Sequence, residues 1–161
     1  MWQSILATSD FLTGGVLLIR GDLEGAFTAF QDGRKIMDAL VQRDPSNKQW
    51  QDMLADSYID AGDLLVLRGD LEGALTAFQN GRQIMDALIQ HDPGKKRWQT
   101  VLASSYIGIG EVLSARGDLE GALTAFQDSQ KIMGSLVVCF NDFDRCSLVI
   151  YSSKRRNTYG P

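Results

Sequence analysis

Cysteine and histidine are scarce in this sequence, and they are the residues that most often build metal and redox sites. The chain contains two cysteines and one histidine. Cys139 and Cys146 are seven residues apart without a CxxC motif, so they predict neither a zinc site nor a redox pair, and two thiols are too few for a disulfide framework. His91 has no cysteine or histidine partner at metal-ligand spacing, so it is expected to be solvated at a helix end. The sequence therefore predicts no bound metal.

Long apolar runs, clustered glycines and excess positive charge are also lacking. No stretch approaches the roughly 18 apolar residues that span a bilayer, and the start resembles no signal peptide. The glycines form no phosphate-binding loop. Lysine and arginine number 16 against 20 acidic residues, a net charge of −4 with no general attraction to nucleic acid. We therefore expect no membrane, nucleic-acid or cofactor partner, and a reduced, cytoplasmic setting.

An internal repeat is the dominant feature of the sequence. Trp2, Trp50 and Trp98 are spaced by 48 residues. The segment Arg-Gly-Asp-Leu-Glu-Gly-Ala occurs three times at the same interval. Self-similarity at a fixed period of this size is typical of a solenoid, in which each unit buries its apolar face against the next.

Each unit is predicted to form two helices. In the second unit, apolar residues follow three- and four-residue steps from Lys48 to Leu67. Gly69 is expected to end this helix in the left-handed conformation, and Asp70 is expected to cap the next one. That helix is predicted to run to about Gln90, before an Asp-Pro pair. Short connections make neighbouring helices antiparallel, so the predicted fold is an all-α solenoid of three antiparallel helical hairpins.

The predicted units differ at the two ends of the array. The repeats cover approximately residues 1–46, 47–94 and 95–137. Asp10 replaces an aromatic residue of the other units, which predicts that the first helix faces solvent. The repeat is lost in the tail, residues 138–161, which we interpret either as an irregular, partly disordered cap or as an array interrupted within a fourth unit.

The unit resembles the tetratricopeptide repeat (TPR). In the second unit the matching residues are Tyr58, Ala61, Gly62, Leu65, Ala74, Phe78 and Pro93. The resemblance covers about residues 1–137 and implies that small residues allow close helix approach while Phe78 fills the space between hairpins. The 48-residue period exceeds the family's roughly 34, as in long-helix variants common in bacterial proteins. Trp50 and Trp98 lie in this extension and are expected to pack against the far end of a second helix, near Met85 and Leu88. All three tryptophans, Trp2 included, are predicted to be core residues.

The resemblance also implies a function: a non-catalytic scaffold that binds a protein, as a peptide or helix, in the concave groove of the first helices. The corresponding groove positions are Thr8, Phe11, Gly15, Leu18, Asp56, Ile59, Asp63, Val66, Ser104, Ile107, Glu111 and Ser114. Three of them are carboxylates and none is basic, so the predicted ligand is an apolar or basic peptide. An alternative interpretation is that these positions are solvated and bind no ligand.

Two other readings concern the repeated motif and the solenoid ends. Arg-Gly-Asp matches the integrin-binding tripeptide, but a helix end followed by a cap explains it better. The recurring Asp22, Asp70 and Asp118 are likewise expected to be caps and not catalytic carboxylates. As an alternative function, exposed solenoid ends would stack head-to-tail into a homo-oligomer, which makes the chain a structural assembly element.

Overall fold

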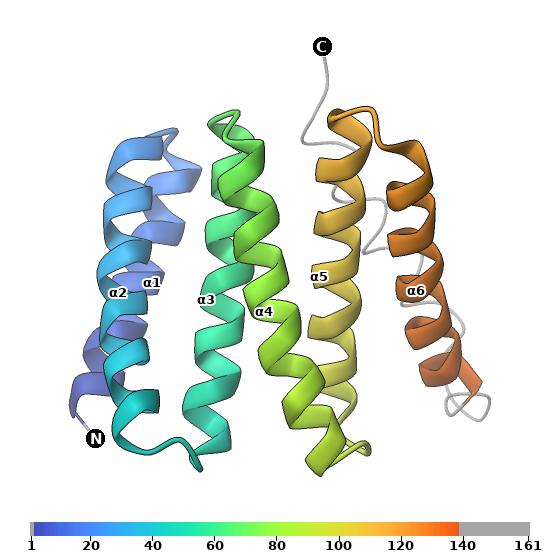
Figure 1. The fold of residues 1–161 in the computed structure, drawn as a ribbon. Helices are drawn as coiled ribbons and strands as arrows, with labels where there is room; N and C mark the ends of the chain where they lie inside the picture. The colour runs from blue at the N-terminus through green and yellow to red at the C-terminus, as the bar shows by residue number, and fades with distance from the viewer. Residues whose placement is uncertain (1, 139–161) are drawn as a thin grey trace.

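The computed structural model describes residues 2–138, and this part of the chain is entirely helical apart from its turns. Figure 1 shows the helices side by side in a single row of hairpins. The helices are α1 (Trp2–Ile19), α2 (Leu23–Arg43), α3 (Lys48–Leu67), α4 (Leu71–His91), α5 (Lys96–Ala115) and α6 (Leu119–Val138). The predicted all-α solenoid of three hairpins is confirmed. The alternatives for the tail, and both cysteines, lie outside the described residues apart from Val138.

The helix boundaries follow the predicted local signals. Gly69 has a φ of +78°, which ends α3 in the left-handed region that glycine adopts without strain. The Asp70 carboxylate then accepts a hydrogen bond of 2.9 Å from the Gly73 backbone N–H, so it caps α4. Asp92, before the proline, is the C-cap of α4, with a non-helical backbone at φ −149° and ψ 82°. A glycine with positive φ followed by a capping aspartate also forms the turn of the other two hairpins, at Gly21 and Asp22 and at Gly117 and Asp118.

Packing between consecutive helices builds the array. Within hairpins, α1 packs on α2, α3 on α4 and α5 on α6. Between hairpins, α2 packs on α3 and α4 on α5, while α3 also contacts α5 directly. The first helices of the second and third units therefore lie side by side.

Phe78 of α4 is the buried core residue on which two neighbouring helices pack. Its side chain is 1% exposed and lies between α3 and α5. A Cβ atom added at Gly62 or at Gly108 would come within 2.7 Å or 2.5 Å of the ring, so both helices approach the phenylalanine closely only because these residues are glycines. The predicted role of Phe78 between successive hairpins is confirmed.

The tryptophans are not equivalent in the fold. Trp98 is 3% exposed and packs with Met85 and Leu88, as expected, and Trp50 is half-buried. The prediction that Trp2 is a core residue is wrong, because this side chain is 71% exposed. The reason is that the tryptophans bury themselves against the preceding hairpin, and no hairpin precedes α1 in the structure.

The arginine of the repeated Arg-Gly-Asp segment has a structural role that the sequence reading missed. The Arg68 guanidinium forms an ion pair of 3.1 Å with Glu24 of the preceding hairpin, and Arg116 forms one of 2.8 Å with Glu72. The motif thus ends one helix, caps the next and links neighbouring hairpins.

Candidate functional site

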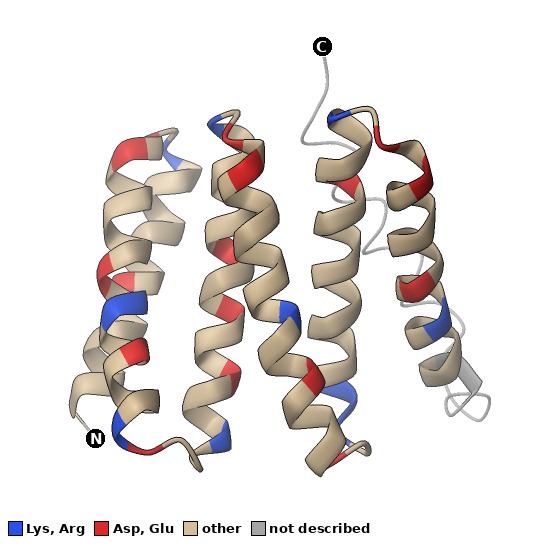
Figure 2. Ribbon diagram, viewed as in Figure 1, with Lys and Arg blue, Asp and Glu red and all other residues tan. Residues whose placement is uncertain are grey.

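The second unit carries a line of carboxylates that the other units lack. Asp52, Asp56, Asp60 and Asp63 follow one another at four- and three-residue steps, which places them on one face of α3. Lys48 is the only basic residue of this helix. Figure 2 shows the acidic residues running along α3. Like charges at this spacing destabilise a helix, so the line of aspartates is a local cost to the fold.

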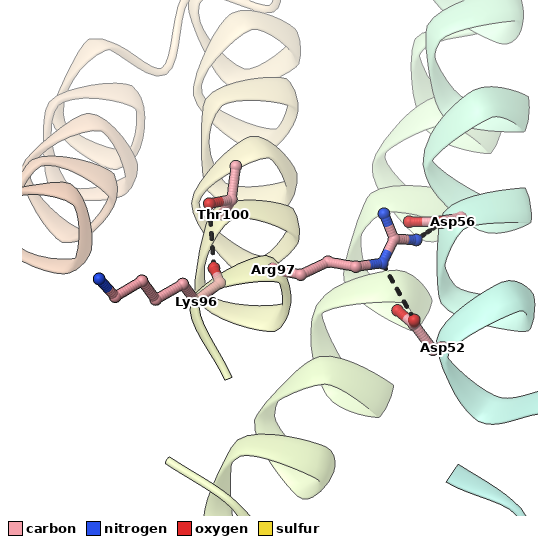
Figure 3. Close-up of polar contacts among 5 residues, drawn as sticks. All are labelled: Asp52, Asp56, Lys96, Arg97 and Thr100. Carbon is pink, nitrogen blue, oxygen red and sulfur yellow. Dashed lines mark hydrogen bonds and ion pairs between the residues drawn. The ribbon is translucent and has the colours of Figure 1, made fainter. Parts of the chain in front are cut away.

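Arg97 of α5 crosses to this acidic face. Its Nε atom donates a hydrogen bond of 3.1 Å to Asp52, and its Nη2 atom donates to Asp56. In Figure 3 Arg97 extends toward α3 while its neighbour Lys96 points to the opposite side of α5. The contact joins residues 45 positions apart and compensates part of the repulsion between the aspartates.

The electrostatics of the two ends of this line differ. Burial raises the pKa of Asp56, and Asp52 raises it further, whereas Arg97 lowers it. The hydrogen bond that Arg97 donates to Asp52 raises the pKa of Arg97, so the guanidinium stays charged. Further along the helix, desolvation and then the charges of Asp56 and Asp63 raise the pKa of Asp60 to about 7. Solvent still reaches the exposed Asp60 side chain, so screening keeps the energetic effect of this shift small.

A cleft of about 440 Å³ lies between α3 and α5 at this place. Its lining residues are Asp56, Ile59, Asp60, Asp63, Arg97, Thr100, Val101 and Ser104. Apolar side chains and three carboxylates face it, together with one guanidinium. The cleft is therefore amphipathic and keeps an excess of negative charge when its carboxylates are ionised.

The structure brings together only some of the predicted groove residues. Those that line the cleft are Asp56, Ile59, Asp63 and Ser104. Ile59 is also largely buried in the core, against the backbone of Gly81. Phe11 packs on α2 in the same way, because a Cβ atom at Gly33 would lie 2.6 Å from its ring.

The remaining predicted residues lie along the same three helices but outside the cleft. Thr8 is exposed on α1, where its hydroxyl donates to the Ser4 carbonyl oxygen at 2.8 Å. Glu111 and Ser114 are exposed on α5. The half-buried members of the set are Gly15, Leu18, Val66 and Ile107.

Sequence reasoning missed the cleft residues Asp60, Arg97, Thr100 and Val101. Helical spacing offered a signal for two of them. Asp60 is one turn from Asp56, and Arg97 is two turns before Ser104, so each shares a face with a residue that was selected. The partnership of Arg97 with Asp52 and Asp56 had no such signal, since it depends on how α5 packs against α3.

Other candidate sites find no further support in the described chain. Among residues 2–138, no group of three or more histidine, aspartate or glutamate residues is arranged to hold a metal ion. His91 is exposed and is the last residue of α4, as expected. None of the six described helices has the length and apolar character needed to cross a membrane.

The geometry defines the class of this chain as a TPR-like α-solenoid, and comparisons with known proteins add little to it. No family model and no curated protein matches the chain. Solved structures that match include a crystal structure of MamA, 15% identical over 77% of this chain and 96% of that one, with a TM-score of 0.23. A crystal structure of MamA protein is 14% identical over 91% and 100%, with a TM-score of 0.26. Such low TM-scores carry no functional argument.

Proposed function

We propose that this chain is a non-catalytic interaction scaffold that binds a peptide or helix of another protein in the cleft between α3 and α5. The preferred ligand carries a lysine or arginine beside apolar residues. The observation that supports the proposal most directly is the composition of the cleft, which combines three carboxylates and one guanidinium with the apolar Ile59 and Val101.

The charge balance of the cleft favours a cationic ligand. Arg97 pairs with Asp52 and Asp56 near one end of the aspartate line. Asp60 forms no ion pair within residues 2–138, and desolvation, followed by the charges of its neighbouring carboxylates, disfavours its ionisation. An ammonium or guanidinium group brought by a ligand would stabilise the ionised form of Asp60, so binding and proton release would be coupled.

The apolar part of the cleft favours a side chain next to that cation. Ile59 and Val101 come from different helices and line the same space. Burying one aliphatic side chain there would contribute about 1.5–3 kcal/mol, which exceeds the value of an exposed ion pair. We therefore expect apolar contact to supply most of the affinity and the carboxylates to select among ligands.

The test begins with a displayed library of random peptides selected on the purified chain at low salt. We expect the recovered peptides to be enriched in lysine or arginine adjacent to apolar residues. Fluorescence anisotropy of one labelled recovered peptide then compares the wild type with Asp60→Asn. The substitution should weaken binding about two- to fivefold and reduce the salt dependence, because one screened charge contact is lost.

Asp32→Asn is the matched control, because Asp32 is an exposed carboxylate of α2 whose ion pair with Lys35 lies away from the cleft. The Asp32→Asn variant should bind the labelled peptide with the same affinity as the wild type. Recovered peptides without basic residues, or equal effects of the two substitutions, would reject the cleft as a cation-selective site.

The outer side of α1 supports a second proposed function, self-assembly through the solenoid ends. Large apolar side chains lie exposed along this helix. We call five of them the α1 outer face: Trp2, Ile5, Leu6, Leu12 and Val16. The exposed surface of the first helix is apolar, and an apolar face of this kind supports the proposal of an interaction site.

A further inference from the structure

The repeat itself identifies the partner of the α1 outer face. Val16 is 57% exposed, whereas the residues 48 and 96 positions later, Leu64 and Val112, are 0% and 1% exposed. Leu64 packs against α2, and Val112 packs against α4. The position that Val16 occupies therefore contacts the second helix of the preceding hairpin wherever such a hairpin is present.

A second position gives the same result. Leu6 is exposed, while its equivalents Leu54 and Leu102 are buried. Leu54 lies in a cluster with Met37 of α2, and Leu102 lies in one with Met85 of α4. The surface that covers this position is thus a second helix with a methionine at the equivalent place.

Within residues 2–138, the other end of the array is α6, a second helix on which no further described hairpin packs. α6 has Phe126 and Met133 where α4 has Phe78 and Met85. Phe78 and Met85 are almost fully buried, whereas Phe126 and Met133 are only half-buried. Leu123, whose equivalent Leu75 packs against the core between α4 and α5, is 53% exposed.

Charges at the two ends are complementary in the same register. Inside the chain, Arg68 pairs with Glu24 and Arg116 pairs with Glu72. Arg20, after α1, is the repeat equivalent of these two arginines, and Glu120, at the start of α6, is the equivalent of the two glutamates. Neither side chain forms an ion pair within residues 2–138, and both are exposed.

We propose that the α1 outer face docks on α6 of a second copy of this chain and reproduces the packing of α3 on α2 and of α5 on α4. This inference rests on the second proposed function and assigns its two mating faces and their register. Because the two faces differ, the contact is heterologous, and stacking continues through further copies without closing at a dimer. Arg20 of one copy pairs with Glu120 of the next.

The intermolecular contact differs from the internal ones at one position. Inside the chain an arginine lies over a tyrosine of the next hairpin, Arg34 at 5.2 Å from the Tyr58 ring and Arg82 at 5.5 Å from the Tyr106 ring. The corresponding residues at the ends are Gln130 and Asp10, so this cation–π contact is replaced by an amide beside a carboxylate. We therefore expect reversible association, weaker than the contacts within the chain.

Sedimentation velocity and light scattering of the full chain over a wide concentration range test the proposal. We expect the average mass to rise continuously with concentration. Val16→Gln should weaken the association about tenfold or more, because it removes one buried aliphatic side chain from the contact. Ile19→Gln is the matched control, since Ile19 is 88% exposed and its equivalents Leu67 and Ala115 stay exposed inside the array.

A charge exchange tests the register. Arg20→Glu and Glu120→Arg should each weaken association up to about fivefold, and the double variant should restore it. A chain that stays monomeric at all concentrations would reject both self-assembly and this register. Mass that stops at a dimer, or a double variant no better than the single ones, would reject the docking of α1 on α6 while leaving self-association in place.

Discussion

The close packing of Gly62 and Gly108 on the Phe78 ring gives the most stringent test of the fold. Gly62 of α3 and Gly108 of α5 face the same three ring atoms, Cδ1, Cε1 and Cζ. A Cβ atom at Gly108 would lie 2.5 Å from Cε1, well inside ordinary contact. The ring has little room to move away from α5, because Gly62 of α3 packs against the same ring atoms. Gly108→Ala should therefore force α4 and α5 apart.

The expected magnitude follows from two opposing terms. Overpacking of a filled core costs about 1–3 kcal/mol. Alanine in place of glycine returns about 0.5–1 kcal/mol through its higher helix propensity. The two ranges leave a net loss of about 0–2.5 kcal/mol for Gly108→Ala, or about 1 kcal/mol at their midpoints. Each kcal/mol lowers the Tm of a chain of this size by about 2–4 °C. Urea and thermal denaturation followed by far-UV circular dichroism measure both quantities.

Gly15→Ala is the control, because a Cβ atom at Gly15 meets nothing within 4 Å. It should stabilise the chain by about 0.5–1 kcal/mol, the propensity gain alone. Phe78→Leu in the Gly108→Ala background should recover part of the loss, since the smaller side chain makes room for the methyl group. If Gly108→Ala stabilises the chain as much as Gly15→Ala does, the conclusion that α5 packs too closely on Phe78 to admit a methyl group is refuted.

Three further predictions concern the acidic face and the caps. Arg97→Gln should lower the free energy of unfolding by about 1–2 kcal/mol in urea denaturation, because Asp52, whose side chain is 17% exposed, loses its cationic partner. The folded chain holds a proton on Asp60 up to about pH 7, above the ordinary value of 3.8, so stability should fall as pH rises through this window. Asp60→Asn should make this decline in stability less steep, by a small amount because Asp60 is exposed. Equal pH profiles of the urea midpoint for the wild type and the variant would contradict the raised pKa of Asp60. Asp70→Ala should cost about 1 kcal/mol in the same assay, because the Gly73 N–H loses its cap.

The comparison of sequence and structure separates local from long-range causes. Helix ends were predictable because a glycine with positive φ and an aspartate cap act within a few residues of chain. The predicted limits of α3, Lys48 to Leu67, agree with the structure for this reason. Trp98 was also placed correctly, because its neighbours are fixed by the repeat.

The candidate site was predictable only in part. Counting from the TPR pattern selected Asp56 and Asp63, which do line the cleft. It passed over Arg97, because the pattern marks positions along each helix and says nothing about which side chains reach across. The resulting picture of a purely acidic and apolar groove lacked the one guanidinium that balances part of its charge.

The amino-acid sequence by itself determined the period, the hairpin and the capped ends of each helix, because these depend on residues close together in the chain. Tertiary structure decided which copy of a repeated residue is buried. Trp2 and Trp98 have the same place in the repeat, yet one is 71% exposed and the other 3%, since burial depends on whether a hairpin lies in front. The cleft likewise exists only because α3 and α5 pack side by side and bring an arginine to carboxylates more than forty residues away.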